Sequence, residues 1–294
     1  VPRGAGSPAV PVQPPYVLAT FGGPGTAPGR FNRPRSITHD GHGTCYVIDL
    51  TDRVQAFDIA TGRFLRLWHL LDIRQGRPQR IRAAPDGILT VADTHYGRVL
   101  RYDNRGTLLG VFGTEGKAPG QLYYPVGLCF LADGRLAVSE YGGHDRVQFF
   151  GMDETLLGGF GKGGTGNGEF IRPEALAQGP DGNLYVADAA NQRVQVFGPD
   201  GTFLRAFGEA GIGRGRLSYP YDLAFDPRGR LIVLEYGAHR LSFWSLQGKW
   251  EGDLGGLGSR PGELASPWGL CALGDGTVLV TNSDNHRIER WRLP

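Results

Sequence analysis

The sequence predicts an all-β fold: a closed six-bladed β-propeller whose blades are four-stranded antiparallel sheets. Two markers recur six times along the chain, and short apolar runs between Gly-containing turns fill the intervals. The first marker is a proline, with 44 to 48 residues between successive copies: Pro34, Pro78, Pro125, Pro173, Pro220 and Pro267. The second is an arginine, with 45 to 48 residues between successive copies: Arg53, Arg98, Arg146, Arg193, Arg240 and Arg287. Two markers with one period indicate six copies of a single structural unit.

The fourth repeat shows the unit most clearly. Its apolar residues alternate or cluster between two Asp-Gly turns, in the segments 174–177, 183–188, 193–197 and 203–207. Apolar runs of about 4–6 residues bounded by such turns are typical of β-strands. Four strands in about 45 residues match one propeller blade.

The pattern resembles the NHL repeat, and the resemblance extends from about Tyr16 to Leu293. Blade two diverges most: it has Trp68-His69 where the other blades have a Phe-Gly type pair, and it lacks the glycine ladder that precedes the other prolines. The fold that this resemblance implies is a six-bladed β-propeller of the NHL type.

The ring is expected to close through its N-terminal strand, because an open stack of blades would leave sheet edges exposed. The sixth repeat ends at Trp291, after its third strand, and the segment 16–22 matches the fourth strand of blade four at 204–208. We therefore expect residues 16–294 to form a single propeller domain. Residues 1–15 are expected to form an extended Pro-rich leader that lies along the propeller or on a partner.

The composition excludes several classes of protein. The net charge of the 294 residues is only +2, which shows no electrostatic bias towards nucleic acid. The three cysteines, Cys45, Cys129 and Cys271, are an odd number, so we expect buried free thiols rather than a disulfide framework. No run approaches the roughly 20 apolar residues of a membrane span. The low lysine content favours a bacterial protein, and a start at Val1 rather than Met indicates either that a leader was removed or that the sequence was trimmed. A periplasmic or extracellular location is favoured over a cytoplasmic one.

A polar residue ends each predicted second strand, four to six positions before the repeat arginine. A charge-assisted hydrogen bond between the two side chains would fix the hairpin that joins them. Because the device occurs in every blade, whereas a catalytic site needs asymmetry, we interpret these residues as structural. The six pairs are Asp49 and Arg53, Asp93 and Arg98, Glu140 and Arg146, Asp188 and Arg193, Glu235 and Arg240, and Asn282 and Arg287.

Histidines precede four of these arginines, at His95, His144, His239 and His286. A metal ion needs its ligands within about 2.1 Å, and hairpin tips on four separate blades do not easily converge that far. We therefore interpret these histidines as exposed turn residues and expect no metal site.

Peptide-amidating lyases resemble NHL propellers and hold zinc on histidines near the ring axis, one of which follows a repeat proline. No histidine follows a repeat proline here, so that zinc site is not carried over. The sequence also contains neither His-Glu-x-x-His nor Gly-x-Ser-x-Gly. It predicts no catalytic residue and no cofactor. The residues after the six prolines are Arg35, Gln79, Val126, Glu174, Tyr221 and Trp268.

The same six positions open the innermost strands, so they are expected to ring one mouth of the propeller. Unlike the repeated pairs, they differ in every blade, and such variation on a repeated scaffold is where function is expected. Two neighbouring tyrosines, Tyr141 and Tyr236, would enlarge the aromatic surface. An alternative is that Trp268 and Tyr221 only plug the axial channel. The residues expected to bind are Arg35, Arg80, Glu174, Tyr221, Asp222 and Trp268.

The sequence favours a non-catalytic scaffold that binds another protein through this mouth, within a larger assembly. One alternative is an enzyme or small-ligand binder that uses the axial pocket in a lyase-like manner. Another is a module for single-stranded RNA, since some NHL propellers bind single strands. Four acids expected on the same face count against the RNA alternative: Glu140, Glu174, Asp222 and Glu235.

Overall fold

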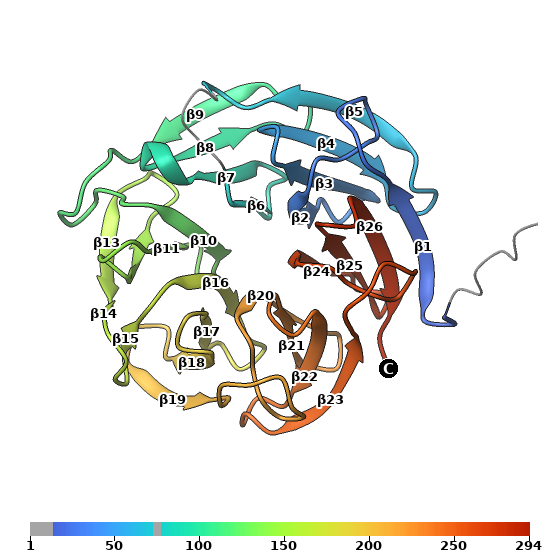
Figure 1. Cartoon of the computed structure of the whole chain (residues 1–294). Helices are drawn as coiled ribbons and strands as arrows, with labels where there is room; N and C mark the ends of the chain where they lie inside the picture. The colour runs from blue at the N-terminus through green and yellow to red at the C-terminus, as the bar shows by residue number, and fades with distance from the viewer. Residues whose placement is uncertain (1–13, 73–77) are drawn as a thin grey trace, which may run out of the picture.

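The computed structural model describes residues 14–72 and 78–294, which form a ring of six four-stranded antiparallel sheets (Figure 1). The predicted closed six-bladed propeller is therefore confirmed. Of the leader expected at residues 1–15, all but the last two positions lie outside the described residues.

The first three blades follow one another along the chain. Blade one contains β2 (Pro34–His39), β3 (Thr44–Asp49), β4 (Arg53–Asp58) and β5 (Phe64–His69). Blade two contains β6 (Arg80–Ala83), β7 (Leu89–Asp93), β8 (Arg98–Tyr102) and β9 (Leu108–Phe112), with the short 3-10 helix η1 (Thr94–Tyr96) between β7 and β8. Blade three contains β10 (Pro125–Phe130), β11 (Leu136–Glu140), β12 (Arg146–Phe150) and β13 (Leu156–Phe160).

The remaining blades complete the circle. A two-stranded parallel pair, β14 (Lys162–Gly163) with β15 (Glu169–Phe170), precedes blade four. Blade four contains β16 (Pro173–Gln178), β17 (Leu184–Asp188), β18 (Arg193–Phe197) and β19 (Phe203–Phe207). Blade five contains β20 (Pro220–Phe225), β21 (Leu231–Glu235), β22 (Arg240–Trp244) and β23 (Trp250–Gly255). Blade six contains β24 (Pro267–Ala272), β25 (Thr277–Asn282), β26 (Arg287–Arg292) and β1 (Val17–Gly22).

The position of a strand in its blade explains its sequence. The second strands are sandwiched between neighbouring blades on both faces, so β17 is buried throughout and reads as a continuous apolar run. The outermost strands face solvent, and β19 alternates between partly buried and exposed residues. Aromatic rings fill the space between blades: the centroids of Phe160 in blade three and Phe197 in blade four lie 4.5 Å apart.

The N-terminal strand closes the ring. β1 pairs antiparallel with β26, with Phe21 opposite Ile288 and Gly22 opposite Arg287, and the two strands lie side by side in Figure 1. The ring of Tyr16 packs edge-on against the fully buried Trp291, with 5.4 Å between centroids. This arrangement confirms that the first strand completes the last blade.

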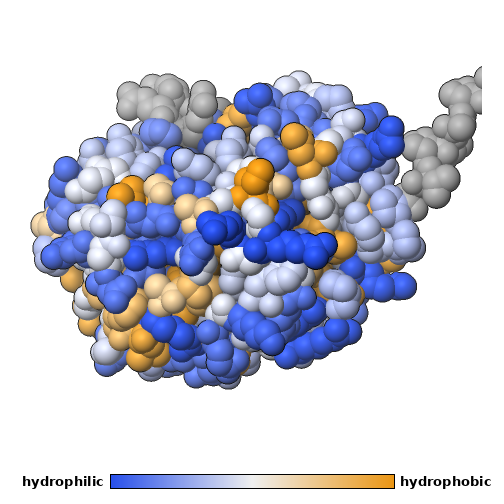
Figure 2. All heavy atoms as spheres, turned by 60° about the horizontal axis from the view of Figure 1, so that its bottom comes forward, coloured by the Kyte–Doolittle hydropathy of each residue, from blue (hydrophilic) through white to orange (hydrophobic). Residues whose placement is uncertain are grey.

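Six inner strands surround the axis: β2, β6, β10, β16, β20 and β24 (Figure 1). We call the side of the ring where these strands begin the front face, and the side where they end the back face. Within the described residues, no helix is long and apolar enough to cross a membrane. On the side seen in Figure 2, apolar residues gather in small patches among hydrophilic ones.

Candidate functional site

The repeat arginines bind the acids at the ends of the second strands in five blades. In blade four, Arg193 Nε lies 2.8 Å from Asp188 Oδ2, and Asp188 is fully buried. Arg193 also donates to the carbonyl oxygens of Gly166 and Glu169, so it ties the inter-blade turn to the hairpin. The distances in the other four pairs are 2.9 Å for Arg53 and Asp49, 2.7 Å for Arg98 and Asp93, 2.9 Å for Arg146 and Glu140, and 2.9 Å for Arg240 and Glu235. We attribute a structural role to these pairs.

Blade six departs from the expected Asn282–Arg287 contact. Arg287 instead binds Glu289, at 2.6 Å, and Asn282 Nδ2 donates to the same carboxylate at 2.9 Å. In blade four the strand end carries the acid, Asp188, and the position two after the arginine carries the amide, Gln195, whose Nε2 lies 3.0 Å from that acid. Acid and amide have thus exchanged places between these blades, and each arrangement provides one carboxylate for the arginine.

Two of the histidines expected in exposed turns have a structural role. His239 Nδ1 accepts a hydrogen bond of 3.0 Å from the backbone N–H of Ser266, which begins the next blade. His286 Nδ1 lies 3.2 Å from the backbone nitrogen of Arg33 in blade one. Asp145 plays the same part between blades three and four, where it accepts from Arg172 N–H at 2.6 Å. In blades three, five and six the side chain one position before the repeat arginine therefore links successive blades, which corrects the interpretation of His239 and His286 as solvated turn residues.

The predicted mouth residues do ring the axis, but most of them are inaccessible. Glu174 and Asp222 are fully buried, and Arg80, Tyr221 and Arg35 are 1%, 5% and 9% exposed. Trp268 is only partly buried. Arg80, Glu174 and Asp222 are too deeply buried for a partner to contact, which corrects that part of the expectation, and we call these three residues the floor of the mouth. The binding expected at Arg35, Tyr221 and Trp268 stays a prediction.

Arg80 makes the central contact of this floor. From blade two its Nη1 reaches Asp222 Oδ2 in blade five at 2.6 Å, and its Nη2 donates to the carbonyl oxygens of Glu174 and Tyr221. Arg82 binds the other oxygen of Asp222 at 2.7 Å. Burial lowers the pKa of Arg80, and Asp222 opposes that shift. The single negative charge of Asp222 is thus shared by the guanidinium groups of Arg80 and Arg82.

An aromatic surface begins on blade three, above this floor. Tyr124 and Tyr141 stack with 5.5 Å between centroids. The guanidinium of Arg172, from blade four, lies 5.3 Å from the ring of Tyr141 and 5.5 Å from the ring of Tyr221. Arginine over aromatic rings is a favourable cation–π arrangement, so Arg172 joins the rings of two blades across the mouth.

The surface continues over blades five and six. Tyr221 stacks on Tyr236 with 4.5 Å between centroids, and Trp268 contacts Tyr236 edge-on at 5.6 Å. The guanidinium of Arg35, from blade one, lies 4.6 Å from the Trp268 ring. We call the whole set the front-face arc: Tyr124, Tyr141, Arg172, Tyr221, Tyr236, Trp268 and Arg35.

The residue before each inner-strand proline adds side chains to this face. Five of these residues have a left-handed backbone, with φ between 47° and 62°, and none is glycine. A left-handed conformation costs a side chain-bearing residue roughly 1–2 kcal/mol, which glycine avoids. The five are Arg33, Tyr124, Arg172, Tyr219 and Ser266, and the corresponding residue of blade two lies outside the described residues. At four of these five positions a large side chain, Arg or Tyr, is therefore present where the backbone alone favours glycine.

A small pocket of about 160 Å³ opens beside the arc, between blades six and one. Trp268 and Tyr236 line it, and an ion pair of 3.0 Å between Arg33 and Asp284 lies across it. The Nε1 of Trp268 is buried and makes no hydrogen bond within the part of the chain that the structure describes. This indole N–H is a donor without an acceptor, next to a cavity.

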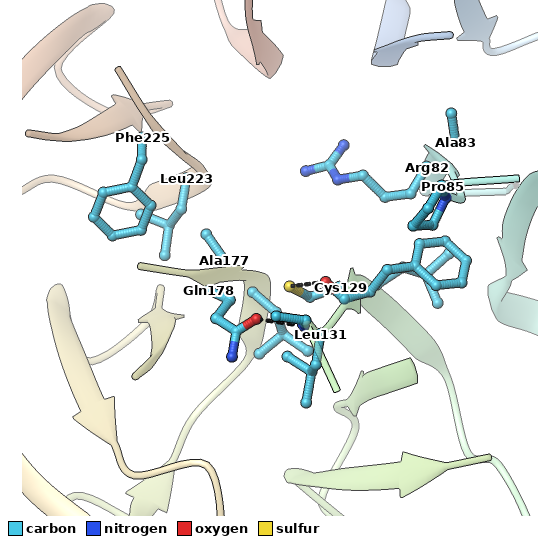
Figure 3. Close-up of a pocket in the computed structure, with 13 residues that line it drawn as sticks. Arg82, Ala83, Pro85, Cys129, Leu131, Ala177, Gln178, Leu223 and Phe225 are labelled. Carbon is cyan, nitrogen blue, oxygen red and sulfur yellow. Dashed lines mark hydrogen bonds between the residues drawn. The ribbon is translucent and has the colours of Figure 1, made fainter. Parts of the chain in front are cut away.

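A second cavity, of about 470 Å³, lies at the back face between blades two to five (Figure 3). Its walls are the ends of four inner strands, with Leu128, Leu223 and Phe225 among the apolar residues. Arg82 extends from β6 towards the centre of this space (Figure 3). Sequence reasoning did not single out Arg82, although its position two after Arg80 on the same strand was visible.

The cysteine thiols are free and protonated. The three cysteines are free, and burial raises the pKa of Cys129 to about 11 and that of Cys271 to about 12, so both are protonated at neutral pH. Among residues 14–72 and 78–294, no three His, Cys, Asp or Glu side chains are grouped to hold a metal ion.

Comparisons with known proteins agree with this geometry. Residues 170–197 and 264–291, in blades four and six, match the NHL repeat. Over 85 residues the chain is 38% identical to NHL repeat-containing protein 3 of Homo sapiens, and it is equally similar to the Mus musculus protein. That segment is 28% of this chain and 24% of either relative, so the match spans about a quarter of the relatives' length.

Solved structures share the fold over most of the chain. A streptogramin B lyase structure has a TM-score of 0.66 at 12% identity and covers 94% of this chain and 98% of its own. Virginiamycin B lyase from Staphylococcus aureus has a TM-score of 0.65 at 14% identity, with 90% and 96% covered. A chain of a mitotic checkpoint complex has a TM-score of 0.68 at 12% identity, with 100% and 96% covered. The repeats, the closed ring and these matches together identify the chain as a six-bladed β-propeller that carries NHL repeats.

Proposed function

We propose that this propeller is a non-catalytic scaffold that binds a protein partner through the front-face arc. The observation that carries the proposal is the continuity of the arc. Its rings and guanidinium groups contact one another from blade three to blade one, around the side of the ring where the inner strands begin. Aromatic residues and arginine are the usual anchors of protein interfaces.

The left-handed backbone at Tyr219 and the small pocket beside Trp268 also support the front face as the binding surface. Tyr219 is 44% exposed and left-handed, so a large apolar surface is held in solvent at a position that favours glycine. The unsatisfied indole N–H of Trp268 lies beside the pocket of about 160 Å³. A side-chain or backbone oxygen from the partner that enters this pocket would accept the hydrogen bond and remove the cost of the buried donor.

Site-specific photo-crosslinking tests the proposal. A photoreactive residue at Tyr219 on the front face is compared with one at Arg228, an exposed residue of the turn after β20 on the back face. The proposal expects a specific adduct with a protein from the native extract at position 219 and not at position 228. A partner that reacts only from position 228 would contradict the choice of face.

A single-stranded nucleic acid is the second candidate, because of where the acids lie. Glu140, Glu174, Asp222 and Glu235 are fully buried and bound to arginines, so they do not oppose a phosphate chain at the surface. The aromatic rings of the front-face arc and Arg172 then remain at the surface, and the bases of a single strand can stack on such rings. Fluorescence anisotropy with labelled oligouridine distinguishes this candidate: binding that weakens steeply with salt supports it, and no binding at low salt excludes it.

A further inference from the structure

The back-face cavity has the size and lining of a small-molecule site, and nothing in the proposed function uses it. Its volume of about 470 Å³ lies within the roughly 300–1,000 Å³ that is usual for ligand pockets. Leu128, Leu131, Ala177, Leu223 and Phe225 supply much of its wall. Among the described residues that line it, Arg82 is the only charged one.

Arg82 carries a positive charge that the protein balances only in part. Its Nη2 lies 2.7 Å from Asp222 Oδ1, but the other oxygen of Asp222 lies 2.6 Å from Arg80, which is 1% exposed. The other acid of the floor, Glu174, binds Arg172. Arg80, Arg82 and Arg172 therefore share two carboxylates, so positive charge exceeds negative charge by one among these five groups.

Arg82 lines the cavity, and its Nη1 donates to the carbonyl oxygens of Ile81 and Ile37, which carry no net charge. The side chain of Arg82 is 17% exposed, whereas Asp222 is not exposed at all. In Figure 3 the guanidinium of Arg82 reaches into the space that the four inner strands enclose. Arginine stays protonated at neutral pH and binds carboxylates with charge-assisted hydrogen bonds.

We propose that the back-face cavity binds a small carboxylic acid with an apolar body, whose carboxylate meets Arg82 while its apolar part packs against Leu128, Leu223 and Phe225. The site is separate from the front-face arc, because the buried Arg80–Asp222 pair lies between them. One carboxylate would balance the excess charge, and the apolar wall would bury the rest of the ligand.

Octanoate and 1-octanol test the proposal by isothermal titration calorimetry, since they share one chain length and differ in the head group. The proposal expects one octanoate per protein, bound at least about tenfold more tightly than octanol, because a hydrogen bond to a charged group contributes on that order. Equal affinities, or no octanoate binding up to millimolar concentration, would overturn it. This comparison needs no variant.

Variants then locate the site. Arg82→Met should remove most of the preference for octanoate, and it leaves Asp222 paired with Arg80. Arg135→Met is the matched control, because Arg135 lies in a back-face turn and pairs with Asp133 outside the cavity. Ala177→Leu, which fills the cavity and keeps Arg82, should weaken both ligands. An unchanged preference in Arg82→Met, or an equal loss in Arg135→Met, would refute the site.

Discussion

The exchange of acid and amide in blade six yields a sharp prediction about stability. Glu289 is fully buried and receives hydrogen bonds from Arg287, Asn282, the backbone of Gly262 and the indole of Trp291. Glu289→Gln removes the carboxylate that Arg287 binds and turns an amide N–H towards the Asn282 donor. Hydrogen bonds to charged groups contribute about 1.5–3 kcal/mol, and an unsatisfied buried donor costs about 1–3 kcal/mol. We expect a loss of roughly 2–4 kcal/mol.

The reciprocal change at Asn282 should also destabilise when made alone. Asn282→Asp places a second carboxylate within hydrogen-bonding distance of Glu289, and two buried like charges cannot both remain ionised without a penalty. The double variant Asn282→Asp, Glu289→Gln, however, reproduces the arrangement of Asp188 and Gln195 in blade four. It should recover most of the stability, with a coupling energy of about 2 kcal/mol or more between the two sites.

Thermal and urea unfolding of the four proteins, followed by tryptophan fluorescence, measure this cycle. At about 2 °C per kcal/mol for a domain of this size, each single variant should melt roughly 4–8 °C lower and the double variant close to the unchanged protein. Additive losses in the double variant would show that the two blades do not use interchangeable pairs, and would refute the reasoning.

Three further predictions concern the scaffold. Deleting residues through Gly22 removes β1 and exposes the edge of β26, so the chain should aggregate or lose much of its stability; a monomer with unchanged melting would rule out the closure. Arg193→Ala should lower the free energy of unfolding in urea by about 1–3 kcal/mol without affecting partner binding. Loss of binding at unchanged stability would instead show that Arg193 and Asp188 belong to the binding site. Burial lowers the pKa of His239, so the folded state favours the neutral imidazole that accepts the hydrogen bond from Ser266. The stability that this hydrogen bond contributes is lost as the pH falls below about 6.5 through the lowered pKa. The melting temperature should therefore fall less between pH 7 and pH 5 in His239→Asn than in the unchanged protein, and an equal fall would contradict the link to Ser266.

The sequence was sufficient for the fold because a repeat encodes it many times over. The prolines and arginines mark every blade, and the unpaired third strand at Trp291 points to its missing neighbour at 16–22. Contacts within one blade were predictable for the same reason, since Asp188 and Arg193 face each other across one hairpin.

Contacts across the axis were not predictable, because periodicity places residues on a face without saying how deep they lie. Arg80 and Asp222 were expected in the mouth, yet their opposite charges meet across the ring and bury both. Arg172 and Tyr124 were missed as members of the arc. A comparison of the residues before the prolines would have found them, since five of those six residues are Arg or Tyr.

The most direct measurement of the central claim compares partner binding in two variants of matched character. Tyr236→Ala removes a partly buried ring from the front-face arc, and Phe225→Ala removes a partly buried ring from the back face of the same blade. With the partner recovered by crosslinking at position 219, the account predicts that Tyr236→Ala weakens binding by about 2 kcal/mol or more, roughly 30-fold, while Phe225→Ala leaves binding unchanged in protein of comparable stability. Full affinity in Tyr236→Ala together with a loss in Phe225→Ala would contradict the claim that the front-face arc is the binding surface.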